Sequence, residues 1–207
     1  MMGKLKKLTG YRLFLPLSCL IIVLLINLIT TPTFFKITIN NGVLYGYIID
    51  VINRASELVV LAVGMTLVVS ASAGTDISVG AVMAVSAAVC TRVLAGGEVS
   101  VNEYANPYIL AVLAALAVAV VCGGFNGFLV AKLKIQPMVA TLILFTAGRG
   151  ISQLVTNGQI TYIRVDGYKL LGNNIPGIPI PTPIFVAVIV VALTYILLKK
   201  TAMGMYI

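Results

Sequence analysis

The chain has 207 residues, of which 60% are hydrophobic and 10% are charged, and its 14 basic and 6 acidic residues give a formal net charge of +8. Because soluble domains carry about 25% charged residues, this composition excludes a soluble globular fold, and the long apolar runs without alternation exclude a transmembrane β-barrel. The sequence predicts an all-α, polytopic helical membrane protein whose positive charge reflects its inner segments rather than nucleic-acid binding.

The residue types that usually carry chemistry are scarce. The chain has no histidine, and Cys19, Cys90 and Cys122 lie inside apolar runs without CxxC spacing. We therefore expect free thiols, no metal site and no cofactor. The pattern GxxxxGK[ST] is also missing, so we do not expect the chain to bind ATP by that route.

The N-terminal segment carries basic residues ahead of a long apolar run. Lys4, Lys6, Lys7 and Arg12 precede residues 13–32, and no acidic residue accompanies them. The run is too long for a secretory signal and lacks a small-x-small cleavage site near its end. It suits the roughly 20 residues that cross a hydrocarbon core of about 30 Å. We predict that this run is the first of about six transmembrane helices and leaves the cytoplasm.

The following segment is mixed in character. Apolar residues between 33 and 57 have helical spacing around Asp50, Arg54 and Glu57, which predicts an amphipathic helix at the outer interface. The second span is then expected over residues 58–72 and the third over 77–95, followed by a loop over 96–106.

A polar joint is expected between the second and third spans, near residues 72–80. Asp76 lies there in an otherwise apolar stretch, bracketed by Gly74 and Gly80. A carboxylate costs about 2.5 to 3.5 kcal/mol at the middle of an inserted helix unless it has a partner, a cap or water. We predict two helices broken at this joint, which lies at a membrane surface or, because the second span is short, re-enters the membrane. Two roles stay open for Asp76: N-cap of the third span, or a gate that contacts the solute.

The fourth span is expected over residues 107–131, and Ala105 to Ala131 contains no charge. Gly123 and Gly127 form a GxxxG pair, which favours close helix packing within the bundle over a dedicated dimer face. Asn126 lies between these glycines, where it either bonds across helices or lines a path.

The fifth span is expected over residues 138–155, interrupted at Gly148-Arg149-Gly150, and the sixth over 184–198. An arginine inside a span needs a partner. For Arg149 we consider a carbonyl, Asp76 or water, with fixing of the bundle as the simpler role. Glycines and prolines mark residues 156–183 as an irregular outer loop.

The charges predict an orientation. With the N-terminus inside, the inner segments hold no acid, whereas the outer segments hold every acidic residue except Asp76. The inner basic residues are Lys4, Lys6, Lys7, Arg12, Lys132, Lys134, Lys199 and Lys200. This asymmetry predicts that both ends are cytoplasmic.

The remaining inventory is a bundle with small residues, a broken helix and a few polar side chains in apolar surroundings. It suits a path for a neutral or hydroxyl-rich solute, because hydroxyls and amides replace the hydration of a sugar without charge. A stand-alone carrier or channel for a small neutral solute is the alternative. On the residues alone the candidates of the path or gate are Asp76, Asn126 and Arg149.

Several ordered motifs resemble those of the ribose-type sugar ABC-transporter permeases, within the branched-chain amino acid and sugar permease family. GMTLV at 64–68 and GTDISVGAV at 74–82 resemble the family's GMTxV and GIDLSVG(A/S)V elements. IQPMVATL at 135–142, AGRG at 147–150 and TNGQ at 156–159 resemble its QPF, RG and TNG elements. Within the family the chain looks most like the galactofuranose-type permeases, through residues 49–55, 141–150 and 201–205.

The resemblance implies a single transmembrane permease domain over residues 1–207 in a bacterial inner membrane. It implies an ATP-binding subunit, an extracytoplasmic sugar-binding protein and a second permease chain as partners. It also implies further candidates of the path or gate, namely Ser78, Gly74, Gly80, Met65 and Thr66. The stretch 70–76 is one residue longer than the usual version and has Thr75 where isoleucine is common. Family members continue past the segment equivalent to Met203–Ile207, so we expect the N-terminal part of a permease, with an inactive truncated permease as the alternative.

Overall fold

The fold is given by a computed structural model. It describes residues 14–31, 33–40, 43–165, 168, 172, 178–202 and 204. Several residues used in the sequence argument lie outside these ranges, namely Lys4, Lys6, Lys7, Arg12, Asp166 and Met203.

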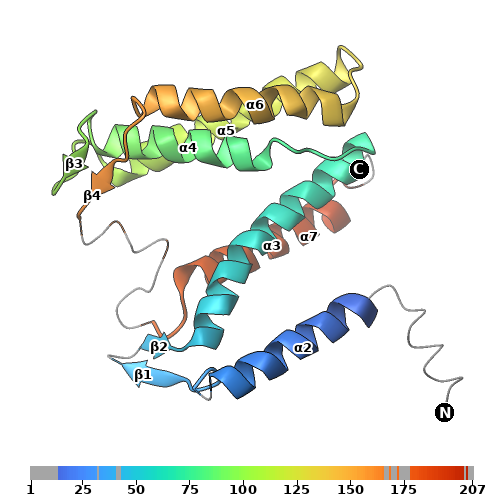
Figure 1. The fold of residues 1–207 in the computed structure, drawn as a ribbon. Coiled ribbons are helices and arrows are strands. Elements are labelled where there is room, and N and C mark those ends of the chain that lie inside the picture. The colour runs from blue at the N-terminus through green and yellow to red at the C-terminus, as the bar shows by residue number, and fades with distance from the viewer. Residues whose placement is uncertain are drawn as a thin grey trace, which may run out of the picture.

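Six helices account for the described membrane segments (Figure 1). Four of them, α3, α5, α6 and α7, are long and apolar enough to cross a membrane, and α2 and α4 are shorter apolar helices. The prediction of an all-α polytopic membrane fold is confirmed. The bounds are α2 Phe14–Thr30, α3 Tyr47–Ser72, α4 Val79–Leu94, α5 Tyr108–Ala131, α6 Pro137–Val155 and α7 Thr182–Lys200.

Helix α3 is one continuous helix of 26 residues. The prediction of a separate interfacial helix, followed by a span that starts at residue 58, is therefore wrong. The apolar spacing of the first part continues in phase into the second, and no proline interrupts it. Asp50, Arg54 and Glu57 all lie on exposed positions of this helix, so they do not oppose its continuation. The helix that leads into the joint is therefore long, with 26 residues, and not short as predicted.

Helix α6 is also continuous, although an interruption was predicted at Gly148-Arg149-Gly150. A Cβ atom added to Gly148 would lie 2.9 Å from Cβ of Ala81. The glycine thus serves a close approach between α6 and α4 instead of a kink. Glycine lowers helix stability by only about 1 kcal/mol, which this packing offsets.

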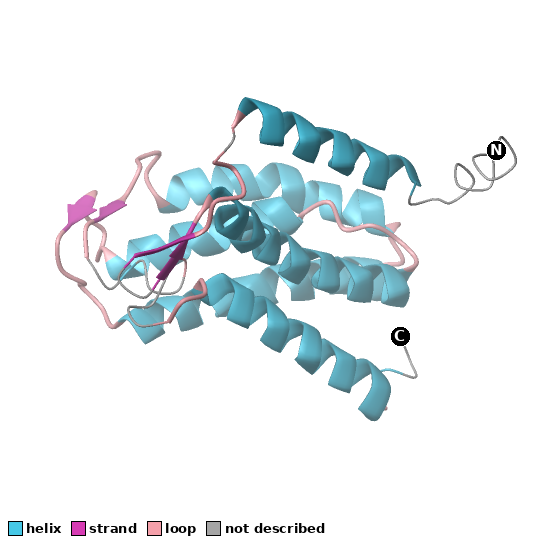
Figure 2. Cartoon of the chain, turned by 90° about the horizontal axis from the view of Figure 1, so that it is seen from below, coloured by secondary structure: helices cyan, strands magenta, loops and turns pink. Residues whose placement is uncertain are grey.

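Helix α4 forms the centre of the packing. It contacts α5 and α6 along their lengths, while α3 pairs with α7 (Figures 1 and 2). Helix α2 lies at the edge of the molecule in both views, and none of its residues is buried. The core is built largely from small side chains, which let the backbones of α4, α5 and α6 approach closely: Ala81, Ala88, Ala95, Ala111 and Ala140.

Two short strand pairs were not predicted. Strands β1 (Thr38–Asn40) and β2 (Val43–Tyr45) pair antiparallel, and β3 (Ser100–Val101) and β4 (Tyr162–Ile163) pair parallel. All four lie at one end of the molecule, opposite the joint between α3 and α4 (Figures 1 and 2). The second pair ties the loop before α5 to the loop after α6, so residues 162–163 form a paired strand where an irregular loop was predicted.

The close approach at Gly148 generates a stability prediction. Gly148→Ala forces a Cβ atom against rigid Ala81, and overpacking of this kind costs about 1–3 kcal/mol. Gly150→Ala is the matched control, because a Cβ atom there meets nothing within 4 Å. Thermal unfolding in detergent, followed by circular dichroism, should give a lower Tm for Gly148→Ala than for the wild type, and an equal or higher Tm for Gly150→Ala. Equal Tm values for the two variants contradict the close packing.

Candidate functional site

The joint between α3 and α4 covers residues 73–78, close to the predicted position. Ala73 takes a left-handed conformation with φ of 53°, and its N–H donates to the carbonyl of Val69, which ends α3. A Cβ atom at Gly74 would lie 2.6 Å from Cβ and Cγ of Pro137. Glycine is therefore required at position 74, because the chain passes directly against the start of α6.

Asp76 holds the last part of the joint through its carboxylate. One oxygen, Oδ1, accepts hydrogen bonds from the backbone N–H and from the hydroxyl of Ser78, both at 2.7 Å. Ser78 is the N-cap residue of α4, two positions after the predicted cap Asp76, whereas the predicted acceptance of a backbone N–H by the Asp76 carboxylate is confirmed. The carboxylate closes a local turn ahead of the helix, where the positive end of the helix dipole favours it.

Two contacts join the joint to neighbouring helices. The side-chain N–H of Asn126 in α5 donates to the hydroxyl of Ser78 at 2.9 Å, and both residues are buried, at 6% and 0% exposure. The backbone N–H of Ile77 donates to the hydroxyl of Thr141 in α6 at 3.2 Å. The prediction that Asn126 bonds across helices is confirmed. The non-helical joint between α3 and α4 is therefore held in place by hydrogen bonds to α5 and α6.

A cavity of about 520 Å³ opens beside the joint. Asp76, Asn126 and Thr141 give it polar groups, and Lys134, from the turn between α5 and α6, stands at its edge. The joint and this basic turn thus lie at the same end of the bundle. Thr141 and Pro137 were not predicted as site residues, although both belong to the 135–142 motif, and that motif was the available signal.

The glycine pair of α5 does not pack within the described part of the chain. A Cβ atom at Gly123 or Gly127 would meet nothing within 4 Å, yet both glycines line the joint cavity. The expected packing inside the bundle is therefore not made among the described residues. The dedicated dimer face, which the sequence favoured less, remains the alternative for these two glycines. Gly80 likewise has open space beside it, so its place in the motif is not explained by packing.

The remaining predicted residues lie away from the joint cavity. Met65 is half-buried in α3, and the exposed Thr66 donates its hydroxyl to the carbonyl of Ala62 at 2.8 Å. Arg149 is exposed on α6, where its guanidinium lies 5.3 Å from the centre of the Phe145 ring. Its partner is thus an aromatic ring, which the sequence argument did not consider.

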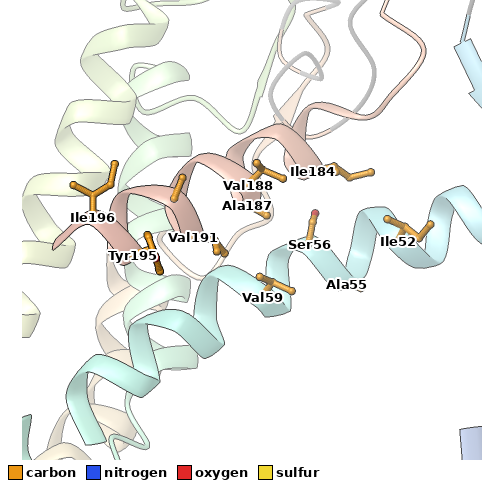
Figure 3. A pocket seen from close by; sticks show the side chains of 11 residues that line it. Ile52, Ala55, Ser56, Val59, Ile184, Ala187, Val188, Val191, Tyr195 and Ile196 are labelled. Carbon is orange, nitrogen blue, oxygen red and sulfur yellow. The ribbon is translucent and has the colours of Figure 1, made fainter. Parts of the chain in front are cut away.

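A second cavity, of about 660 Å³, is apolar and lies between α3 and α7 (Figure 3). Ile52 and Val59 from α3 face Val188 and neighbouring aliphatic residues of α7. The hydroxyl of Ser56 donates its hydrogen bond to the carbonyl of Asn53. Because this groove offers few groups that can bind a polar solute, the joint cavity is the stronger candidate for a path.

Comparison with known proteins identifies relatives over most of the chain. Residues 47–207 match the family described as branched-chain amino acid transport system / permease component. The chain is 42% identical to the galactofuranose transporter permease protein YtfT of Escherichia coli, over 92% of this chain and 53% of the relative. It is 36% identical to the fructose import permease protein FruF of Bifidobacterium longum, over 98% of this chain and 56% of the relative.

A third relative is the ribose import permease protein RbsC of Escherichia coli, which is 32% identical over 92% of this chain and 56% of the relative. The chain therefore spans about half the length of the curated relatives that it matches. No solved structure matches the chain.

The shared hydroxyl of Ser78 generates a second prediction. Ser78→Ala removes the acceptor of the Asn126 amide and leaves that amide buried without a partner among the described residues, which costs about 1–3 kcal/mol. Thermal unfolding should show this loss, whereas Ser18→Ala, which removes an exposed hydroxyl, should leave Tm unchanged. The double variant Ser78→Ala/Asn126→Leu should lose less than the sum of its single variants. Strict additivity contradicts a coupled pair.

Proposed function

Because the chain belongs to the branched-chain amino acid transport system / permease component family, we propose that it is a membrane-spanning permease subunit of an ATP-binding-cassette importer. In this proposal it forms part of the path for a monosaccharide. The observation that carries the proposal is the family match, which covers the joint, its partners on α5 and α6, and both cavities described above.

The substrate class is supported by the relatives and by the chemistry of the joint. The three relatives described above are named for galactofuranose, fructose and ribose. A monosaccharide is neutral and carries hydroxyls, each of which donates and accepts. The amide of Asn126 and the hydroxyl of Thr141 at the joint cavity have matching chemistry without a net charge. The single carboxylate of Asp76 adds a strong acceptor.

The joint is the element that moves in the proposed mechanism. It connects α3 to α4 through a stretch that is not helical, and its residues bond to α5 through Ser78 and to α6 through Ile77. A displacement of α3 against the other helices would therefore bend the chain at residues 73–78. Because Asp76 accepts from both the backbone N–H and the hydroxyl of Ser78, the start of α4 moves with the carboxylate.

The partners follow the architecture of such importers. An ATP-binding subunit supplies the energy on a separate chain, an extracytoplasmic sugar-binding protein delivers the sugar, and a second permease chain completes the pore. The exposed Gly123 and Gly127 beside the joint cavity provide a surface on which a helix of another chain can approach closely.

The proposed orientation places the N-terminus in the cytoplasm of a bacterial cell. Lys132 and Lys134 lie in the turn before α6, and Lys199 and Lys200 end α7, at the end of the molecule that holds the joint (Figure 1). The acidic residues Glu98 and Glu103 lie near the strands at the other end. This distribution supports the positive-inside arrangement.

The proposal is tested by sugar uptake. In the complete transporter, assembled with its ATP-binding subunit and binding protein, Asp76→Ala should reduce uptake of labelled sugar without preventing membrane insertion. The reason is that the start of α4 loses the acceptor of two hydrogen bonds at 2.7 Å. Removing a hydrogen bond to a charged group costs about 1.5–3 kcal/mol, which is a loss of roughly 10-fold or more if the joint conformation limits transport.

Glu98→Ala is the matched control, because it removes an exposed carboxylate in the loop before α5. It should leave uptake at the wild-type rate. Uptake at the wild-type rate by Asp76→Ala would contradict the role given to the joint. Absence of ATP-dependent sugar uptake by the wild-type transporter would contradict the proposed function itself.

A further inference from the structure

A third cavity, of about 280 Å³, lies between α4 and α6 at the end opposite the joint. Its α4 wall is made of alanines, including Ala84 and Ala87, whose small side chains leave the space open. The other residues that line it are mostly neutral and polar. Thr91 comes from α4, and Ser152 and Gln153 come from the last turn of α6.

The rim of this cavity is shaped by the turn that follows α6. Asn157 and Gly158 both adopt left-handed conformations, with φ of 53° and 67°. The N–H of Gly158 donates to the carbonyl of Gln153 at 2.7 Å, and the N–H of Gln159 donates to the carbonyl of Thr156 at 3.1 Å. These bonds reverse the chain tightly, so Thr156 and Gln159 line the same cavity.

Three hydroxyl groups of the cavity, those of Thr91, Ser152 and Thr156, have their hydrogens directed to the backbone. Thr91 donates to the carbonyls of Ala87 and Ala88 at 3.0 Å, and Thr156 donates to that of Ser152 at 3.1 Å. Ser152 donates to the carbonyl of Arg149 at 2.8 Å. The oxygens of these three hydroxyls therefore remain as acceptors.

The side-chain amides supply the opposite polarity. Gln153 and Gln159 make no side-chain hydrogen bond to any residue that the structure describes. Each amide group offers two N–H donors and one carbonyl acceptor. The cavity thus combines fixed acceptors with free donors, and no charged residue lines it.

We infer that this cavity is an extracytoplasmic binding site for a single monosaccharide, which occupies it before reaching the joint. The inference rests on the proposed function and adds a named site to it. A sugar hydroxyl donates one hydrogen bond and accepts others, so it matches a neutral set of acceptors and amide donors. The volume of about 280 Å³ lies just below the range for drug-sized pockets, about 300–1,000 Å³, which suits a ligand as small as a single sugar ring.

The location of the cavity fits a path toward the joint. Helices α4 and α6 run side by side from the joint to this cavity (Figure 1). At about 1.5 Å per residue, Ser78 and Thr91 are separated by about 20 Å along α4. The same helix pair therefore carries a neutral polar site at one end and the joint cavity at the other.

The site is tested by saturation-transfer difference NMR on the chain in phospholipid nanodiscs, with D-ribose, D-fructose and D-galactose as separate probes and glycine betaine as a zwitterionic solute without hydroxyls. At least one sugar should receive saturation, and glycine betaine should not. Thr156→Val and Gln153→Leu should each weaken the apparent affinity about 3- to 10-fold, as expected for the loss of one or two neutral hydrogen bonds.

Thr146→Val is a matched control. Thr146 lies on the same helix and donates to the carbonyls of Leu142 and Ile143, in the pattern that Thr156 makes with Ser152 and Gln153, but it does not line the cavity. Its affinity for the sugar should equal that of the wild type. Circular dichroism of all variants should show unchanged helix content, which ties a loss of affinity to the cavity.

The inference is overturned if Thr156→Val and Gln153→Leu both bind sugar like the wild type. It is equally overturned if these variants alter the association state of the chain instead, since that result assigns the polar surface to a protein contact. The uptake assay separates the two proposals. Uptake by the wild-type transporter without saturation transfer removes this site and leaves the function, whereas the absence of both removes the function as well.

Discussion

The hydroxyl of Ser78 is the point on which the arrangement of the helices depends. It donates to the carboxylate of Asp76 and accepts from the amide of Asn126, and it is fully buried. Each contact alone contributes about 1 kcal/mol or somewhat more. Together they convert a break in the chain, which would otherwise expose unpaired backbone groups, into a defined connection between α3, α4 and α5. In surroundings with few polar groups, leaving one of these partners unpaired would cost more than forming the bond gains.

The small side chains of α4 are the second constraint, and they explain why cavities occur where they do. Ala81 receives Gly148 of α6 at a distance that excludes a larger residue. Further along α4, Ala84 and Ala87 face the last turn of α6. No large side chain fills the space between them and α6, so a cavity remains. Tight contact and open cavity are therefore two outcomes of the same composition. They depend on whether the opposing helix presents a glycine or a polar side chain that ends in hydrogen bonds to its own backbone.

The sequence was sufficient for the membrane class, for most of the helix bounds and for the position of the joint, because hydropathy and glycine spacing are local signals. The sequence-based predictions failed where the outcome depended on the helical phase of side chains or on contacts between residues distant in the chain. The continuity of α3 through Glu57 depends on charges staying on one exposed face, and the continuity of α6 through Gly148 depends on a neighbour that a local pattern does not reveal. The roles of Thr141 and Pro137 at the joint come from contacts with residues distant in the chain. Both residues lie within the motif at residues 135–142, but a sequence motif does not reveal which distant residues its members contact.

The strength of the joint has a consequence for how it can work. Its connections to the rest of the bundle are one hydrogen bond to Asn126, one longer bond to Thr141 and the contact of Gly74 with Pro137. Neutral hydrogen bonds of this kind contribute about 0.5–1.5 kcal/mol each. The two bonds together contribute about 1–3 kcal/mol, which is comparable to the coupling free energy of about 1–3 kcal/mol by which a ligand or a partner typically shifts a two-state equilibrium. The two bonds between Asp76 and Ser78 are local and involve a charge, so they are stronger and survive such a shift. In the proposed mechanism the turn of Asp76 and Ser78 would therefore move as a whole, and the bonds that exchange would be those to α5 and α6.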